Sequence, residues 1–195
     1  MLQNVHFEIP PFINKSELPK RTCANRIGYH HMCRFHAKSL YEQPILARLH
    51  YVWRLDDDSY ITKHIGYDVF RLMRDRHKQY GFVSLRTDTP RCIIGLWSAV
   101  KKYMRQRSIK PKFKWPHRRI FYNNFEISDL NVWRSHEYRD YIDYIDRLGG
   151  IYYHRWGDAT IKTIAVTLFL SKNRMHHFND IGYKHGRPLS RFIKV

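Results

Sequence analysis

The sequence predicts an α/β sandwich in which helices cover a partly parallel sheet. The main observation is that short runs of aromatic and β-branched residues alternate with helix-like stretches of about 10–15 residues. A chain of 195 residues with 43% hydrophobic content is also long enough for one domain with a sizeable core, here taken as 1–195. Its aromatic content of 15% argues against disorder. In such folds, ligands gather at the carboxyl ends of strands.

The first elements are predicted from local composition. Residues 1–22 are expected to be irregular because they contain three prolines, and the pattern over 28–40 is ambiguous. A helix is expected over 67–81, closed by Gly81, and a short amphipathic helix over 94–104. Strands are expected where aromatic and β-branched residues cluster, over 50–55, 82–85 and 119–127.

Two later helices have clearer ends. The first is expected to be capped by Ser135 and ended by Gly149. Its buried stripe is predicted to be Tyr138, Tyr141, Ile142, Ile145 and Leu148. Asp158 is expected to cap the second helix. That helix is predicted to bury Ile161, Ile164, Ala165 and Leu168. His176 and His177 then begin a short strand and are assigned structural roles.

The positive charge is the strongest signal in the composition. The chain has 35 Lys and Arg against 17 Asp and Glu, a formal net charge of +18. Such a surface favours polyanions, including nucleic acid, phosphorylated sugars, nucleotides and acidic membranes. Residues 101–119 hold nine Lys or Arg and no acid, with Tyr, Phe and Trp interleaved. This pattern fits a nucleic-acid groove and a solvated basic loop about equally well.

Neither a membrane span nor a secretion signal is predicted. The longest apolar stretch, TIAVTLFL at 163–170, is far shorter than the roughly 20 residues that a membrane-spanning helix needs. The N-terminus lacks the charged start and apolar centre of a signal peptide, so the chain is expected to be soluble, with no address of its own. Cys23, Cys33 and Cys92 lack metal-site spacing and allow at most one disulfide plus one thiol, which leaves the redox compartment open.

The stretch YVWRLDDDSYI at 51–61 is the main candidate for chemistry. It places Asp56, Asp57 and Asp58 directly after an apolar run that resembles a strand. Two carboxylates spaced as Asp-x-Asp on a turn can hold a divalent cation, which would neutralise a diphosphate leaving group. Nucleotide-sugar transferases use this arrangement, but nucleases and phosphatases also use paired carboxylates. A run of acids can also be a solvated turn.

The blocks around these acids resemble one known family. The blocks are PPFINKSEL at 10–18, GYHHMCRF at 28–35, YVWRLDDD at 51–58, YDVFRLM at 67–73, NNFEISDL at 123–130, EYRDYIDYIDRLGGIYYHRWGDA at 137–159 and HHFNDIGYKH at 176–185. In this order they resemble the fungal Golgi α-1,2-mannosyltransferase family, the glycolipid 2-alpha-mannosyltransferase type of glycosyltransferase family 15. RWGDA and DIGY are the most specific.

The resemblance implies a fold, a reaction and a location. The fold is a GT-A-like mixed sheet flanked by helices. The reaction is a retaining, Mn²⁺-dependent transfer of mannose from GDP-mannose to a mannose-terminated glycan on protein or lipid, forming an α-1,2 linkage. The location is the Golgi lumen. A nuclease is disfavoured because the surrounding blocks fit the transferase family, and nucleic acid is an unfavoured partner that the basic charge does not exclude.

The resemblance also assigns roles to charged residues. The family's metal-binding carboxylate falls on Asp56, its final acid on Asp58 and its metal-binding histidine on His185. The family usually reads Glu-Pro-Asp where this chain reads Asp-Asp-Asp, so the first side chain is shorter and the turn lacks its proline. Glu126 matches a candidate nucleophile, or is simply an acid at a strand end. Asp158 matches an acid that could orient or deprotonate the acceptor hydroxyl.

Three further residues are candidates for binding the donor or the acceptor. Tyr29 matches a family tyrosine at one of the two sugars, where a phenol offers a stacking face and a hydrogen-bonding tip. Arg34 could contact the donor phosphates through two parallel hydrogen bonds. Trp156, beside Asp158, could form a platform for a sugar. Core packing is the alternative for both aromatic residues.

The chain is expected to lack part of the family's N-terminal nucleotide-binding half. Family members carry a cytoplasmic tail, a membrane anchor, a stem and a strand-helix-strand portion before the PPFI block, whereas nine residues precede that block here. Two functions therefore stay open. One is a metal-dependent mannosyltransferase, and the other is a non-catalytic descendant that binds a polyanion through 101–119.

Overall fold

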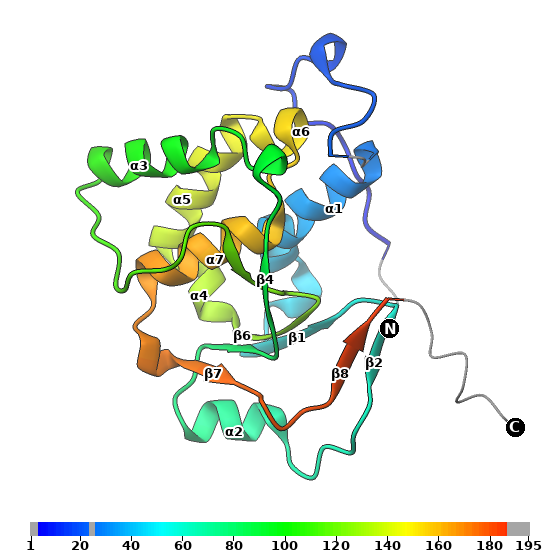
Figure 1. The fold of residues 1–195 in the computed structure, drawn as a ribbon, viewed down its shortest axis with the longest axis vertical. Coiled ribbons are helices and arrows are strands. Elements are labelled where there is room, and N and C mark those ends of the chain that lie inside the picture. The colour runs from blue at the N-terminus through cyan, green and yellow to red at the C-terminus, as the bar shows by residue number, and fades with distance from the viewer. Residues whose placement is uncertain (1–3, 24–25, 187–195) are drawn as a thin grey trace, which may run out of the picture.

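A four-stranded mixed sheet lies at the centre of the computed structural model, which describes residues 4–23 and 26–186 (Figure 1). The strand order is β1-β6-β3-β7, with β1–β6 and β6–β3 antiparallel and β3–β7 parallel. Two smaller sheets pair β2 with β8 and β4 with β5. The strands are β1 (Tyr51–Leu55), β2 (Ser59–Ile61), β3 (Tyr80–Phe82), β4 (Leu85–Thr87), β5 (Arg119–Phe121), β6 (Phe125–Asp129), β7 (Met175–His177) and β8 (Tyr183–His185).

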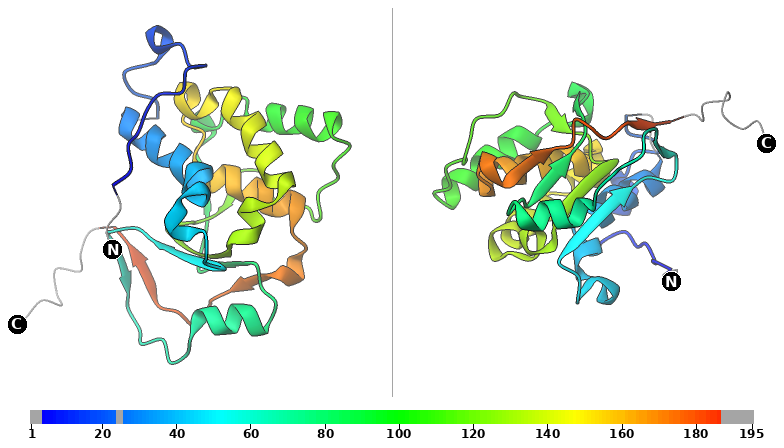
Figure 2. Two further views of the ribbon diagram at one scale, coloured as in Figure 1. Left: turned by 180° about the vertical axis from the view of Figure 1, so that it is seen from behind. Right: turned by 90° about the horizontal axis from the view of Figure 1, so that it is seen from below.

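Helices cover both faces of this sheet unequally (Figures 1 and 2). One face carries α1 (Ile27–Ala37), α3 (Leu96–Gln106), α4 (Leu130–Arg134), α5 (His136–Arg147), α6 (Gly150–His154) and α7 (Asp158–Phe169). The other face carries α2 (Val69–Asp75). Short 3₁₀ helices connect these elements: η1 (Lys15–Glu17), η2 (Ser39–Glu42), η3 (Pro44–Leu46), η4 (Pro90–Cys92) and η5 (Lys172–Arg174). None of the helices in the described part of the chain has the length and apolar character to cross a membrane.

The alternation of side chains along β6 divides the core in two. Phe125 and Ile127 face α2 and pack with Val69 and Met73 in the smaller core. Because successive strand residues point to opposite faces, Glu126 points toward the larger helical layer. A charged side chain is thereby buried between the sheet and α7.

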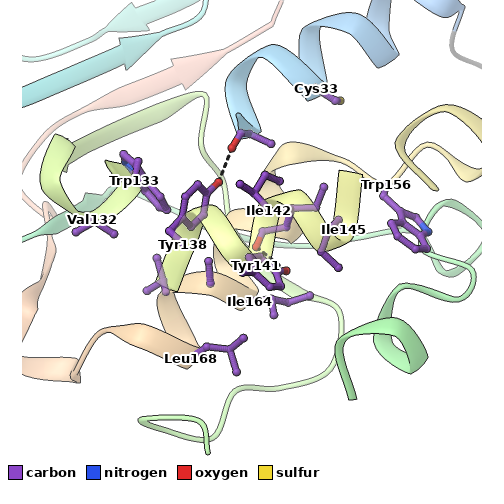
Figure 3. Close-up of a cluster of buried hydrophobic side chains, with 14 of the residues drawn as sticks. Cys33, Val132, Trp133, Tyr138, Tyr141, Ile142, Ile145, Trp156, Ile164 and Leu168 are labelled. Carbon is purple, nitrogen blue, oxygen red and sulfur yellow. Dashed lines mark hydrogen bonds between the residues drawn. The ribbon is translucent and has the colours of Figure 1, made fainter. Parts of the chain in front are cut away.

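The larger core is built around α5 and α7 (Figure 3). Ser135 accepts a hydrogen bond from the Tyr138 backbone N–H at 3.2 Å, which caps α5 as predicted. The Tyr138 hydroxyl donates to the Ala37 carbonyl at 2.6 Å and ties α5 to the end of α1. The predicted stripe is buried except for Leu148, which is 46% exposed because α5 ends at Arg147.

Several boundaries differ from the prediction. The helix predicted over 67–81 ends at Asp75, and Gly81 lies inside β3 rather than at a helix end. A Cβ on Gly81 would lie 2.6 Å from the Phe178 ring, so this glycine allows close packing of the strand. The strand predicted over 82–85 is likewise split between β3 and β4. The ambiguous stretch 28–40 forms α1 and the start of η2.

Two further predictions are corrected near the end of β5 and the start of α7. The strand predicted over 119–127 is two strands, β5 and β6, separated by residues 122–124. The N-cap of α7 is Gly157, and Asp158 is the first helical residue, its carboxylate turned toward Arg54 and Asn123. The predicted strand at 50–55 and helix at 94–104 are confirmed as β1 and α3.

The cysteines form one disulfide and leave one thiol, as their number allowed. Cys23 and Cys92 are bonded across 69 positions of sequence and join the segment before α1 to η4. Cys33 is buried and free, and burial raises the pKa of its thiol. A disulfide of this kind persists in oxidising compartments.

Gly150→Ala is expected to destabilise the fold. An added Cβ would overlap the Trp156 indole, and such overpacking lowers the free energy of unfolding by about 1–3 kcal/mol. The control is Gly28→Ala in α1, where a Cβ meets nothing within 4 Å. Chemical denaturation should show a lower free energy of unfolding for Gly150→Ala and no such loss for Gly28→Ala. Equal stability of both variants would contradict the packing argument.

Candidate active site

The three predicted metal ligands lie together where β1 ends. Asp56 follows the last residue of β1, and the next strand, β2, pairs with β8 so that Ser59 is opposite His185. The Nε2 atom of His185 lies 2.9 Å from Oδ1 of Asp58 and 3.7 Å from Oδ2 of Asp56. The β2–β8 pairing therefore brings a histidine from the end of the described chain to the acidic turn.

Residues 122–124, which form the turn between β5 and β6, orient this group. Two of them, Tyr122 and Asn124, were not among the site residues predicted from the sequence. Nδ1 of His185 lies 2.9 Å from the Tyr122 hydroxyl. A metal ligand would need Nε2 without a proton, which requires Nδ1 to carry the proton and donate it to that hydroxyl. Asn124 donates to Asp56 and lies 2.8 Å from Nε2. The available signal was the Asn-Asn pair between two strand-like runs, which is typical of a turn.

The residue types fit a divalent cation, although they are not arranged as a finished metal site. Two carboxylates and an imidazole suit manganese. Within residues 4–23 and 26–186, however, no three His, Cys, Asp or Glu side chains converge as a metal site. The Asp56 carboxylate is instead bonded by Asn124 and by Arg54 Nε, the latter at 2.9 Å. An ion would have to compete with these partners for Asp56.

A cavity of about 110 Å³ adjoins the acidic turn. Asp56, Asp158, Tyr29 and Arg155 contribute to its lining. Asp158 is buried and accepts hydrogen bonds from Arg54 and Asn123. Burial alone would raise the pKa of this carboxyl, but Arg54, the His36 ring and Asn123 together hold it well below its usual range. Asp158 is therefore an anion at neutral pH.

A second buried pair lies beneath the cavity. Glu126 is 1% exposed and accepts hydrogen bonds from Lys162, from Ser128 at 3.0 Å and from Tyr80 at 3.3 Å. Burial lowers the pKa of Lys162, although Glu126 acts against this shift. Asp158 and Lys162 are four residues apart in α7, so both point toward the sheet. Glu126 does not line the cavity in this arrangement.

Tyr29 is held at the cavity by Arg155. The guanidinium donates from Nη2 to the Tyr29 hydroxyl at 2.7 Å and lies 4.9 Å from the ring centroid. Nη1 donates to Asp88 at 3.2 Å, and Asp88 in turn accepts from Thr160. Arg155 has a φ of 64°, in the left-handed region, where a residue other than glycine is strained. Burial raises the pKa of Tyr29, so its phenol is neutral at pH 7.

The structure does not bring the other two predicted binding residues to the site. Arg34 makes a two-pronged ion pair with buried Asp146, with Nε and Nη2 each 2.9 Å from its oxygens. This pair joins α1 to α5, so the guanidinium is not directed at a phosphate. Trp156 is 4% exposed, donates from its indole to the Ile94 carbonyl at 2.7 Å and packs over Gly150. It is a core residue rather than a sugar platform.

Comparison with known proteins identifies the family. The sequence pattern of the Glycolipid 2-alpha-mannosyltransferase family matches residues 3–190. The chain belongs to this family. A relative named probable mannosyltransferase KTR3, from Saccharomyces cerevisiae, is 32% identical over 204 residues, covering 92% of this chain and 50% of the relative. Another, named alpha-1,2 mannosyltransferase KTR1, from the same yeast, is 36% identical over 174 residues, covering 82% and 44%.

Two solved structures of the family share the fold. The mannosyltransferase Ktr4p from S. cerevisiae in complex with GDP has a TM-score of 0.86 at 33% identity, covering 92% of this chain and 53% of that chain. Core-mannan synthase A from Aspergillus fumigatus, in a Mn/GDP form, also has a TM-score of 0.86, at 30% identity, covering 92% and 56%. The expected GT-A-like mixed sheet flanked by helices is confirmed. The chain spans about half the length of the relatives it matches.

Removing either charge of the Glu126–Lys162 pair is expected to destabilise the fold, and the two effects are expected not to be additive. Glu126→Gln or Lys162→Met alone leaves one buried charge without its partner, which lowers the free energy of unfolding by about 3–5 kcal/mol. The double variant should lose less than the sum of the two, as measured by a double-mutant cycle of denaturation. Asp75→Asn, in the exposed Arg71–Asp75 pair, is the control and should change nothing. Additive single effects would contradict the coupling.

His36 is expected to make stability depend on pH between about 4 and 6.5. Burial, reinforced by Arg54, lowers the pKa of its imidazole to about 4, and Nδ1 lacks a hydrogen-bond partner in the described part of the chain. Above pH 6.5 the ring is neutral in both states. As the pH falls further, the unfolded chain takes up a proton that the folded chain refuses, so stability drops by roughly 3 kcal/mol by pH 4.

The measurement is urea denaturation of the native chain and His36→Phe across this pH range. In the variant, the free energy of unfolding should fall less steeply between pH 6.5 and 4 than in the native chain, whatever the variant's absolute stability. Identical slopes for the two proteins would mean that His36 is readily protonated in the folded state.

Proposed function

We propose that this chain is the metal- and sugar-facing part of a retaining α-1,2-mannosyltransferase that moves mannose from GDP-mannose to a mannose-terminated glycan. The observation that carries the proposal is the meeting of Asp56, Asp58 and His185 at the end of β1. The relatives support it: one is named an alpha-1,2 mannosyltransferase, one was solved with GDP and one in a Mn/GDP form.

In this proposal, Asp56, Asp58 and His185 hold Mn²⁺, which when bound neutralises the diphosphate of the donor and so makes it a better leaving group. The chain itself supplies the orientation. Tyr122 fixes the imidazole of His185, and Arg54 links Asp56 to buried Asp158. The Arg54 guanidinium therefore sets where the first metal-binding carboxylate lies.

The cavity residues divide into positioning and hydrogen-bonding roles. A carboxylate with a strongly lowered pKa is a poor base, so we assign Asp158 to positioning of Arg54 and Asn123 rather than to removal of the acceptor proton. Tyr29 accepts from Arg155, which leaves its own O–H free to donate to a sugar or phosphate oxygen in the cavity. The nucleophile role of Glu126 stays a prediction, and contact with the donor would require the Lys162 pair to open.

The Cys23–Cys92 disulfide supports an oxidising compartment, and we propose the Golgi lumen, the location typical of the family. The alternative function, polyanion binding through 101–119, has less support where the polyanion is a nucleic acid. The aromatic residues of that segment pack inward: Tyr103 is 1% exposed, and the Trp115 ring lies 4.5 Å from that of Phe121. Tyr103 is therefore not free to stack on a base, and Phe113 and Trp115 are partly buried against the larger core.

Asp56→Ala is expected to abolish manganese-dependent binding of GDP-mannose, because it removes the carboxylate at the centre of the proposed metal set. Calorimetric titration of the purified chain with the donor, with and without Mn²⁺, measures this directly. Asp57→Ala is the matched control, since Asp57 is the exposed member of the same turn and should leave binding intact. Donor binding that persists in Asp56→Ala, or is absent from the native chain at millimolar donor, would refute the proposal.

A further inference from the structure

A cavity of about 740 Å³ lies at the opposite end of the sheet from the candidate active site. Tyr51, the first residue of β1, is in its lining, whereas Asp56 follows the last residue of the same strand. Asp129, at the end of β6, and Gln79, just before β3, also line it. The cavity is therefore separate from the acidic turn.

The lining of this cavity carries more cations than acids. Its basic side chains are Arg71, Arg74, Lys78 and Arg174. The two acids in the lining, Asp68 and Asp129, are already engaged by backbone N–H groups. Asp68 accepts from residues 70 and 71 at 2.9 and 3.0 Å, and Asp129 accepts from residue 131 at 2.9 Å. The acids serve the ends of α2 and α4. Four Lys or Arg side chains face these two carboxylates, and Arg71 and Arg74 also pair with Asp75 at 3.5 and 2.8 Å, so the lining keeps a modest net positive charge.

A second cavity extends this surface. It has a volume of about 520 Å³ and shares Gln79 and Asn131 with the first. It adds two bases, Lys110 and Lys112 from the chain after α3, and one acid, Glu137. We call the two together the basal groove. Its length and repeated cations suit an extended anion better than a single small one.

We propose that the basal groove binds an anionic glycan, with acidic groups such as phosphates along the sugar chain contacting its arginines and lysines. The argument for an anion site uses only the charge and shape of the groove. The argument that this anion is a glycan rests on the proposed function and on the disulfide. An oxidising secretory compartment holds glycans rather than nucleic acid. The phenyl and phenol rings of the groove's lining are limited to Tyr51, Phe70 and Phe169, and the Tyr51 hydroxyl donates to the Lys78 carbonyl at 3.0 Å. Binding of single strands normally relies on several such rings.

The test is fluorescence anisotropy of the full chain with three labelled probes of equal length. These are a phosphorylated mannohexaose, unphosphorylated mannohexaose and single-stranded RNA matched in charge to the first. We expect the phosphorylated glycan to bind, with affinity that falls as salt rises, and the neutral one not to bind. RNA binding more tightly than the phosphorylated glycan would overturn the glycan assignment. Equal binding of the two mannans would overturn the anion site.

A pair of matched variants separates the groove from net charge. Arg71→Gln/Arg74→Gln removes two charges from the groove, at side chains that are 73% and 67% exposed. Lys101→Gln/Lys102→Gln removes two exposed charges from α3, outside the groove. The first variant should weaken glycan binding about tenfold and the second less than twofold. If both variants weakened glycan binding equally, the binding would depend on the net charge of the protein and not on the groove.

The proposed transferase function and the proposed glycan binding in the basal groove can be refuted separately. GDP-mannose titration of Arg71→Gln/Arg74→Gln should match the native chain, and glycan binding by Asp56→Ala should also match it. A loss of glycan binding in Asp56→Ala would mean that the glycan binds at the acidic turn, which would overturn the groove.

Discussion

The arrangement of the site depends on two buried ion pairs between the sheet and α7. Arg54 of β1 pairs with Asp158, and Glu126 of β6 pairs with Lys162, with all four side chains at most 9% exposed. Removing four charges from water costs several kcal/mol each, which only good pairing offsets. Because the partners come from three elements, a shift of α7 by one residue along the sheet would separate them. The pairs therefore fix the register of α7 over β1 and β6.

The same Arg54 transmits this constraint to the acidic turn. Its Nε bonds Asp56 at 2.9 Å while its Nη1 bonds Asp158, so a buried anchor determines the position of a partly exposed carboxylate. Asp56 thus lies next to Asp58 and His185 without converging with them on one point. The residues that we propose to hold a metal ion are therefore adjacent without converging, because the Arg54 guanidinium lies beside Asp56 where a cation would bind.

The sequence predicted what depends on local pattern and missed what depends on distant partners. The strand before the acids and the Ser135 cap follow from local pattern, whereas the number of cysteines only limited the chain to at most one disulfide. Gly81 was assigned to a helix end because a capping glycine and a glycine needed for close packing look the same in sequence. Arg34 and Trp156 were assigned to ligands because their partners, Asp146 and the Ile94 carbonyl, are 112 and 62 positions away. Lys162 gave no sign of its burial, since a lysine in an apolar helix usually reaches solvent.

The buried pairs also determine where the net charge acts. Two acids and two bases cancel within the core, so the excess of +18 is carried outside these pairs, and the turn at Asp56–Asp58 is a local exception. An anionic donor would be repelled by three adjacent carboxylates, and a bound cation reverses that repulsion. The basal groove needs no such ion, because its lining carries more Lys and Arg side chains than acids. The two ends of β1 therefore differ in the way each would attract an anion, one through a cation and the other directly.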